Sequence, residues 1–282
     1  MKFSQPKSEV YCWDGADPEE AIKTTSHLAL CAHQDDIEIL AVHGILQAFN
    51  RKDRAFTGVV VTNGAGSARD FEYADYTDEQ MQAIRRIEQK KAAHVGEFAA
   101  QIMLDHPSKH VKTSGQEEPI DDIYRILELS QPEVVYTHNL CDKHDTHIGV
   151  VLRTIEALRR LPADKRPKKV IGCEVWRDLD WLPEEIKVAM DVTGHENLQA
   201  ALLGVFDSQI AGGKRYDLAA MGRRKAHATF SESHGVDKTE GMIYGMDLMP
   251  LVEDPNLDPL EFARSLIEVF AKDVAARVAR LT

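Results

Sequence analysis

The chain of 282 residues is 43% hydrophobic and 28% charged, a composition typical of a globular protein large enough to bury a sizeable core. Its formal net charge of −12 argues against a nucleic-acid-binding protein that relies on a broad basic surface. No apolar run reaches the roughly 18 residues needed to span a bilayer, and the first residues lack the apolar stretch of a secretory signal. We therefore expect no membrane insertion and a cytoplasmic location.

Strands and helices alternate along the first 160 residues. Short apolar or β-branched runs predict strands over residues 27–33, 56–64, 99–104 and 132–139. Helical spacing of apolar residues predicts helices over residues 36–49, 77–96, 117–130 and 146–161. The second of these helices begins with a capping box formed by Thr77 and Gln80. This alternation predicts an open α/β sheet that is mostly parallel.

The remainder of the chain continues the α/β pattern less regularly. It predicts strands over residues 168–176 and 186–192, a helix over residues 197–209 and a long closing helix over residues 257–281. No shift in composition marks a domain boundary, so we expect a single α/β domain over residues 1–282.

Two polar clusters follow predicted strands. His-Gln-Asp-Asp, residues 33–36, ends the first strand. The segment 137–150 follows the fourth strand and contains His138, Asp142, His144, Asp145 and His147. In open α/β sheets, ligands bind outside the carboxyl ends of the strands. The two clusters could therefore converge on one site.

The residue types in these clusters suit metal-assisted hydrolysis. A catalytic zinc site needs three nitrogen or oxygen ligands and one open position, and it lowers the pKa of a bound water. A neighbouring carboxylate can accept the proton of that water, and an imidazolium can stabilise an oxyanion. The alternatives are an aspartate pair that caps a helix and histidines that are structural. Spacing alone leaves both interpretations open.

The motifs resemble those of a known family. "AHQDDIEI" resembles the AHPDDxE signature of the LmbE/PIG-L-like zinc-dependent de-N-acetylases, and "HDTH" resembles their second motif, HPDH. "IRRIEQKKAAHVG" is similar to the family's R-x-x-E helix, read onto Arg85 and Glu88, and "VVVTNGAGSARD" and "FDSQ" resemble two further segments. The resemblance covers about residues 26–210 and implies a Rossmann-like sheet with helices on both faces. Residues 211–282 then form a C-terminal α/β extension.

The resemblance implies a role for each matching residue. His33, Asp36 and His147 would bind one Zn²⁺ per chain, and other divalent metals are compatible with these ligands. Asp35 would be the general base that accepts a proton from the attacking water. His144 would be the charged group that stabilises the tetrahedral oxyanion.

The implied reaction removes an N-acetyl group from a small N-acetylglucosamine-type conjugate, so the expected partner is an amino-sugar substrate. The resemblance also allows a homo-oligomer. The alternatives are a metallohydrolase of another amide or ester bond and a degenerate sugar-binding relative without activity. A dinucleotide-binding domain is disfavoured, because HQDD stands where a GxGxxG loop would be needed.

Two positions depart from the family pattern. Gln34 replaces the usual proline, which loosens the turn between the strand and the carboxylates. Thr146 stands where the family has aspartate, which removes a partner that could orient a histidine, although Asp142 or Asp145 could replace it. His138 is interpreted either as a support of the site or as a structural residue.

Further candidates concern the substrate. Arg69 and Arg85 are predicted to bind it, with the alternatives that Arg69 is a surface residue and that Arg85 pairs with the helix's glutamate behind the site. His227 and His234 are candidates to enter the pocket. The basic segment 214–225 is either a solvated helix or a contact for an anionic or polyhydroxyl substrate.

Overall fold

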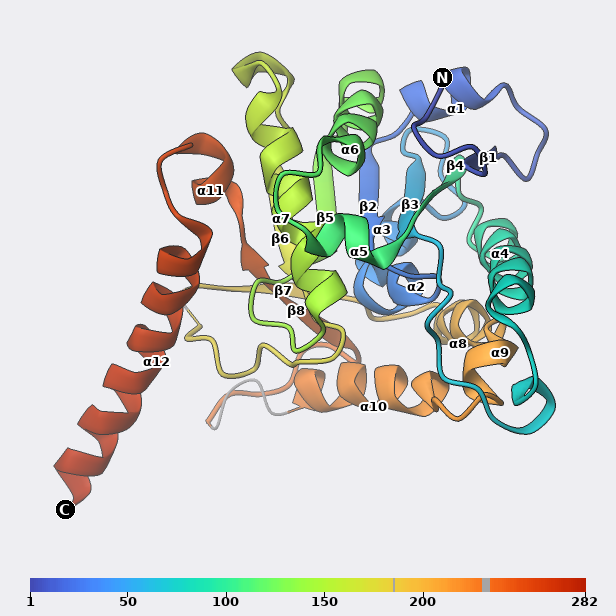
Figure 1. The fold of residues 1–282 in the computed structure, drawn as a ribbon. Helices are drawn as coiled ribbons and strands as arrows, with labels where there is room; N and C mark the ends of the chain where they lie inside the picture. Colours follow the sequence, from blue (N-terminus) through green and yellow to red (C-terminus); the bar gives the residue numbers. More distant parts are fainter. Residues whose placement is uncertain (185, 230–233) are drawn as a thin grey trace.

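A mixed sheet of eight strands runs through the described part of the chain, in the order β1-β4-β3-β2-β5-β6-β8-β7 (Figure 1). The computed structural model describes residues 1–184, 186–229 and 234–282. The strands are β1 (Glu9–Tyr11), β2 (His27–Cys31), β3 (Phe56–Thr62), β4 (Ala100–His106), β5 (Val134–His138), β6 (Lys169–Cys173), β7 (Lys187–Asp191) and β8 (Met242–Asp247). The five strands from β4 to β6 are parallel, which confirms the predicted mostly parallel α/β sheet.

Helices cover both faces of the sheet (Figure 1). They are α1 (Pro18–Lys23), α2 (Asp36–Leu40), α3 (Val42–Ala48), α4 (Asp78–Val95), α5 (Ser108–Lys112), α6 (Glu117–Ser130), α7 (Asp145–Arg160), α8 (Glu196–Gly204), α9 (Asp207–Ile210), α10 (Tyr216–Thr229), α11 (Met249–Glu253) and α12 (Pro259–Leu281). One core packs α1, α6, α7 and α11 on the sheet, and the other packs α2, α3, α8 and α10 on the opposite face. No helix in the described residues is long and apolar enough to cross a membrane.

The position of β2 decides where a ligand can bind. The chain passes from β2 outward through β3 to β4, then returns to the other side of β2 to form β5 and β6. β2 and β5 are therefore parallel neighbours, with Leu30 opposite Thr137. The loops that follow them diverge at one edge of the sheet, which opens a crevice there. Both polar clusters lie on these two loops.

Two predicted helices and two strands of the sheet differ from the prediction. The helix expected over residues 36–49 is interrupted at Ala41 and forms α2 and α3, and the one expected over residues 197–209 forms α8 and α9. No pattern in the sequence predicted β8, which inserts antiparallel between β6 and β7. The short edge strand β1 was not predicted either, and it pairs antiparallel with β4.

Candidate metal centre and active-site pocket

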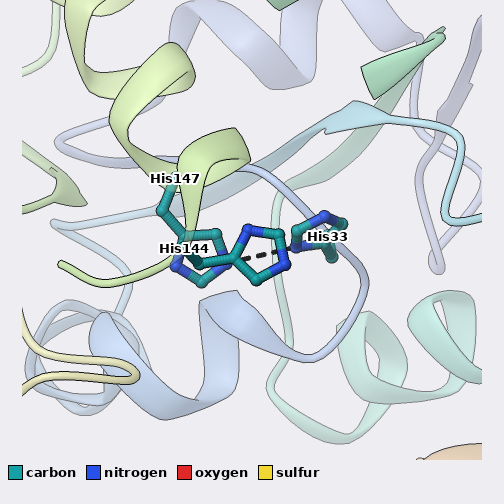
Figure 2. Close-up of side chains that lie close together, drawn as sticks. All are labelled: His33, His144 and His147. Atoms are coloured by element: carbon teal, nitrogen blue, oxygen red, sulfur yellow. Dashed lines mark hydrogen bonds between the residues drawn. The ribbon is translucent and has the colours of Figure 1, made fainter. Parts of the chain in front are cut away.

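The carboxylate of Asp36 lies among three imidazoles. Its Oδ2 is 3.3 Å from Nδ1 of His33, 3.4 Å from Nε2 of His147 and 3.5 Å from Nε2 of His138. Nδ1 of His33 is in turn 3.2 Å from Nε2 of His147, the contact drawn in Figure 2. The structure thus brings the three predicted metal ligands together from the loop after β2 and the start of α7.

These separations suit a metal ion. Ligand atoms about 2.0–2.2 Å from a tetrahedral zinc lie roughly 3.4 Å from one another. The three pairs among His33, Asp36 and His147 are separated by 3.2–3.4 Å. Burial alone raises the pKa of Asp36, but the surrounding histidines lower that pKa far below its usual range. The residues therefore present an ionised carboxylate and two imidazole nitrogens at one point.

Asp142 orients this centre. Its Oδ2 is 3.4 Å from Nδ1 of His147 and accepts the backbone N–H of Trp176, while its Oδ1 accepts the backbone N–H of His144. Asp142 is buried and Asp145 is exposed, so of these two carboxylates it is Asp142 that is placed to orient His147.

His138 packs against His147 and bonds to the backbone next to His33. Its ring is fully buried and stacks on His147 with a centroid distance of 3.9 Å. Its Nε2 accepts the backbone N–H of Ala32 at 2.8 Å, which ties β5 to the residue before His33. Burial lowers the pKa of His138 well below its usual value, so this ring is neutral.

His144 occupies the N-cap of α7 and faces the pocket. Its Nδ1 accepts the backbone N–H of Thr146 at 3.2 Å. Burial lowers the pKa of His144, which favours a neutral ring over the charged group expected from the resemblance. Because Nδ1 is an acceptor, Nε2 carries the proton of this ring and can donate it. The ring stacks on His147 and meets His33 edge-on, with a centroid distance of 5.0 Å (Figure 2).

Asp35 is held in a strained backbone conformation. Its φ of 95° lies in a region that residues other than glycine rarely adopt. The backbone N–H of Asp35 donates to Gln89, whose side-chain amide donates to the buried carboxyl group of Glu38. Burial raises the pKa of Asp35 to about 8, opposed by the charge of Arg85. Strain and a raised pKa at one carboxyl group are typical of a catalytic base.

Arg85 fastens two loops at this edge of the sheet. It is 3% exposed, and its guanidinium donates to the carbonyls of Gln34 and Gly64 and lies 3.5 Å from Oδ2 of Asp35. Arg85 also lines the pocket. Because both terminal nitrogens of the guanidinium contact these groups, the geometry favours a role for Arg85 in positioning Asp35. Direct binding of substrate by Arg85 stays a prediction.

The glutamate of the predicted R-x-x-E helix has a different partner. Glu88 is buried and accepts hydrogen bonds from the backbone N–H and the hydroxyl of Ser208, at 2.7 and 2.6 Å. Ser208 belongs to the "FDSQ" segment, so two of the segments with family resemblance are bonded to each other. Glu88 thereby joins α4 to α9 behind the site.

Arg69, predicted to bind substrate, braces its own loop. Its guanidinium donates to the carbonyls of Tyr76 and Ala65 and pairs with Asp78. It is not among the residues that line the pocket. The geometry therefore gives this prediction no support.

The two histidines proposed for the pocket lie elsewhere. His227 is buried with its Nε2 3.1 Å from both carboxylate oxygens of Glu174, and His234 is exposed. Neither lines the pocket.

A cavity of about 780 Å³ opens beside Asp35 and Asp36. Sequence reasoning missed most of the residues that shape its far wall: Lys112, Lys143, Trp176 and Tyr216. Lys214 also lines it, with Nζ 5.1 Å from the centre of the Trp176 ring. Tyr216 and Lys214 come from the basic segment 214–225, for which contact with an anionic or polyhydroxyl substrate was one interpretation. For Trp176, the available signal was its position at the end of a predicted strand.

Comparison with protein families gives one match. The family model of PIG-L, GlcNAc-PI de-N-acetylase, matches residues 28–158, the segment from β2 into α7 that contains both polar clusters. No curated protein matches the sequence significantly.

Solved structures share the fold at low sequence identity. The conserved protein TT1542 from Thermus thermophilus is 15% identical, with a TM-score of 0.58 over 83% of this chain and 99% of that one. The N,N'-diacetylchitobiose deacetylase from Pyrococcus horikoshii is 18% identical, with a TM-score of 0.57 over 81% and 86%. GalB, the 4-carboxy-2-hydroxymuconate hydratase from Pseudomonas putida, is 17% identical, with a TM-score of 0.57 over 79% and 96%.

Proposed function

We propose that the chain, whose residues 28–158 match the family model of PIG-L, GlcNAc-PI de-N-acetylase, is a hydrolase of that type. In this proposal it removes an N-acetyl group from a small N-acetylglucosamine-type conjugate with the help of one zinc ion. The observation that carries the proposal is the convergence of His33, Asp36 and His147, 3.2–3.4 Å apart, beside the buried Asp35. In this proposal the first three residues hold the zinc, which would polarise the acyl group and acidify a water molecule.

Asp35 is the proton carrier in this scheme. Its carboxylate accepts a proton from the water that attacks the acyl carbon, and then delivers that proton to the leaving nitrogen. The amide becomes an acetate and a free amine, so no proton is gained or lost at Asp35 over the cycle. Gln89 and Arg85 hold Asp35 in its strained position and thus aim the carboxylate.

His144 stabilises the negative charge that develops on the acyl oxygen. Its Nε2 is free to donate because Thr146 occupies Nδ1. The stack on His147 and the N-cap position fix the direction of that donor before substrate arrives.

The pocket wall suits a sugar that carries negative charge. Trp176 and Tyr216 present aromatic rings 6.0 Å apart at an interplanar angle of 81°, surfaces on which the C–H face of a sugar can pack. Lys112, Lys143 and Lys214 also line the cavity and carry positive charge. In a chain with a net charge of −12, such a cluster favours an anionic group on the substrate.

Other chemistry remains compatible with the fold, since GalB, named as a hydratase, shares it. The test is therefore an assay of amine release from neutral and anionic N-acetylglucosamine conjugates, with a hydratase assay on an unsaturated carboxylate in parallel. Release of amine supports the proposal. Addition of water to the carbon–carbon double bond without amine release contradicts it, and binding of the sugars without turnover favours the degenerate relative.

The proposed preference for anionic substrates can be tested separately with lysine variants. Lys214→Ala and Lys112→Ala should raise KM for anionic conjugates and leave KM for neutral ones unchanged. Lys109→Ala removes a lysine from the same short helix as Lys112 but outside the pocket, and should change neither value. The cytoplasmic location and a homo-oligomeric state are parts of the sequence prediction that this assay does not address.

A further inference from the structure

A second group of metal-ligating side chains lies at the end of β4, which β3 separates from β2 in the sheet. His106 ends β4, His110 lies on α5 and Glu118 lies in the first turn of α6. Each offers one ligand atom, and these three atoms lie within 4.8 Å of one another. None of the three belongs to the centre around Asp36. From this group we infer a second metal site, for a divalent transition metal that accepts imidazole and carboxylate ligands, such as zinc.

Asp122 prepares His106 as a ligand. The carboxylate of Asp122 is fully buried and accepts hydrogen bonds from the backbone N–H and hydroxyl of Ser4 and from Arg125. It lies 3.1 Å from Nε2 of His106. Because an ionised carboxylate only accepts, Nε2 of His106 carries the proton and Nδ1 bears the lone pair. A carboxylate that fixes the tautomer of a metal-ligating histidine in this way is a recurring feature of zinc sites.

Nδ1 of His106 accepts no hydrogen bond from the described residues. The residue is 0% exposed, and its Nδ1 is buried without a hydrogen-bond partner among the described residues. The same holds for Nδ1 of His110, which lies 3.8 Å from Oε2 of Glu118. A buried polar atom without a hydrogen-bond partner is energetically unfavourable. A cation shared by both nitrogens and the carboxylate satisfies all three atoms at once.

The ligand set also matches a known type of site. Two histidines and one glutamate, with a position left for water, is one of the ligand combinations found for zinc. The side chains of His110 and Glu118 are 34% and 56% exposed, so a metal ion can enter from solvent while His106 anchors it from inside. Gln5 donates a hydrogen bond to Glu118 and so steadies the exposed ligand.

This site would stiffen one wall of the active-site pocket. Ser108 and Lys112, on α5 with His110, line the pocket beside Asp36. The other side of α5 packs closely on α7, because a Cβ added to Gly149 would lie 2.7 Å from the carbonyl oxygen of Val111. A metal that ties α5 to β4 and α6 therefore holds the pocket wall against the helix that carries His147.

Zinc content of tag-free protein tests the inference, after loading with zinc and passage over a weak chelating resin. Wild type should retain two zinc ions per chain, His110→Ala one and His147→Ala one, and the double variant none. Lys109→Ala, a neighbouring change on α5, should retain two. Equal zinc content in His110→Ala and wild type would overturn the second site, as would zinc that binds there only at millimolar concentration.

A second variant and a second metal provide controls for the zinc measurement. If His110→Ala misfolds by circular dichroism, Glu118→Gln replaces it, since its amide oxygen can still accept from Gln5. Cobalt(II) bound to the second site of the His147→Ala variant should show the visible absorption of a low-symmetry cobalt complex. The His110→Ala/His147→Ala double variant should not show this absorption. Failure of the proposed function is distinguishable, because wild type and His147→Ala would then both retain one zinc and His110→Ala none.

Discussion

Oδ2 of Asp142 lies 3.4 Å from Nδ1 of His147, on the side of the ring opposite the nitrogen that approaches Asp36. Asp142→Asn should therefore weaken zinc binding about 10- to 100-fold, because the ring loses the acceptor that fixes its tautomer and direction. Competition with a fluorescent chelator measures this affinity. Asp145→Asn changes an exposed neighbour and should leave it unaltered. Equal affinities for the two variants would show that Asp142 does not orient the ligand.

His144 can be tested without disturbing its helix. His144→Asn removes the imidazole but keeps an N-cap side chain that can accept the N–H of Thr146, so α7 should remain stable. We expect kcat to fall about 10²- to 10³-fold, as for the loss of one oxyanion donor, with zinc content unchanged. Steady-state kinetics and metal analysis on the same sample check this. A loss of zinc in parallel with activity would instead make His144 a ligand.

Both the backbone conformation of residue 64 and the closeness of the Gln34 side chain require a glycine at this position. Its φ is +71°, and a Cβ there would lie 2.3 Å from Oε1 of Gln34. Gly64→Ala should lower the free energy of unfolding by about 1–3 kcal/mol. Adding Gln34→Ala removes the clash and should recover part of that loss, leaving the strain of the positive φ. Urea unfolding of both single variants and the double variant measures the coupling, and strict additivity would contradict the contact.

Stability should depend on pH through His27, far from the site. Burial lowers the pKa of this β2 residue to about 4 from an ordinary 6.5. Since the unfolded chain then binds the proton more readily, stability is complete above about pH 6.5 and falls as the pH drops toward 4. Between pH 7 and pH 5 the loss from this residue is roughly 2 kcal/mol.

His27→Gln removes the titrating group and keeps a polar side chain next to Ser26. The difference in unfolding free energy between pH 7 and pH 5 should then shrink by roughly that amount in urea titrations. The same pH dependence in variant and wild type would mean that His27 is not held neutral by burial.

The sequence could predict that the two polar clusters lie close together, because each cluster is placed by the strand that precedes it. HQDD ends one predicted strand and HDTH lies in the segment that follows another, and the loops after parallel strands meet at one edge of the sheet. What remained open was whether the two strands are neighbours, and the pairing of β2 with β5 answers it. The choice between Asp142 and Asp145 was also open, because it depends on which carboxylate faces inward.

The pocket wall and the strand β8 could not be predicted in the same way. Trp176 and Tyr216 come from separate segments, and only the three-dimensional arrangement places them on one cavity. Arg69 looked available for substrate, but the carbonyls of its own loop bind it, a local contact that no periodic pattern reports. The strand β8 has a glycine within a short apolar run, which weakens the β signal, and its long-range pairing with β6 and β7 stabilises it.

The most direct test of the account pairs zinc content at the Asp36 centre with acetate release from N-acetylglucosamine conjugates. Asp35→Asn tolerates the positive φ and should keep that zinc while acetate release falls about 10²- to 10⁴-fold. His147→Ala should lose both the zinc and the activity. If Asp35→Asn stays active, or if wild type releases acetate equally well after all metal is removed, then metal-assisted de-N-acetylation at this centre is wrong.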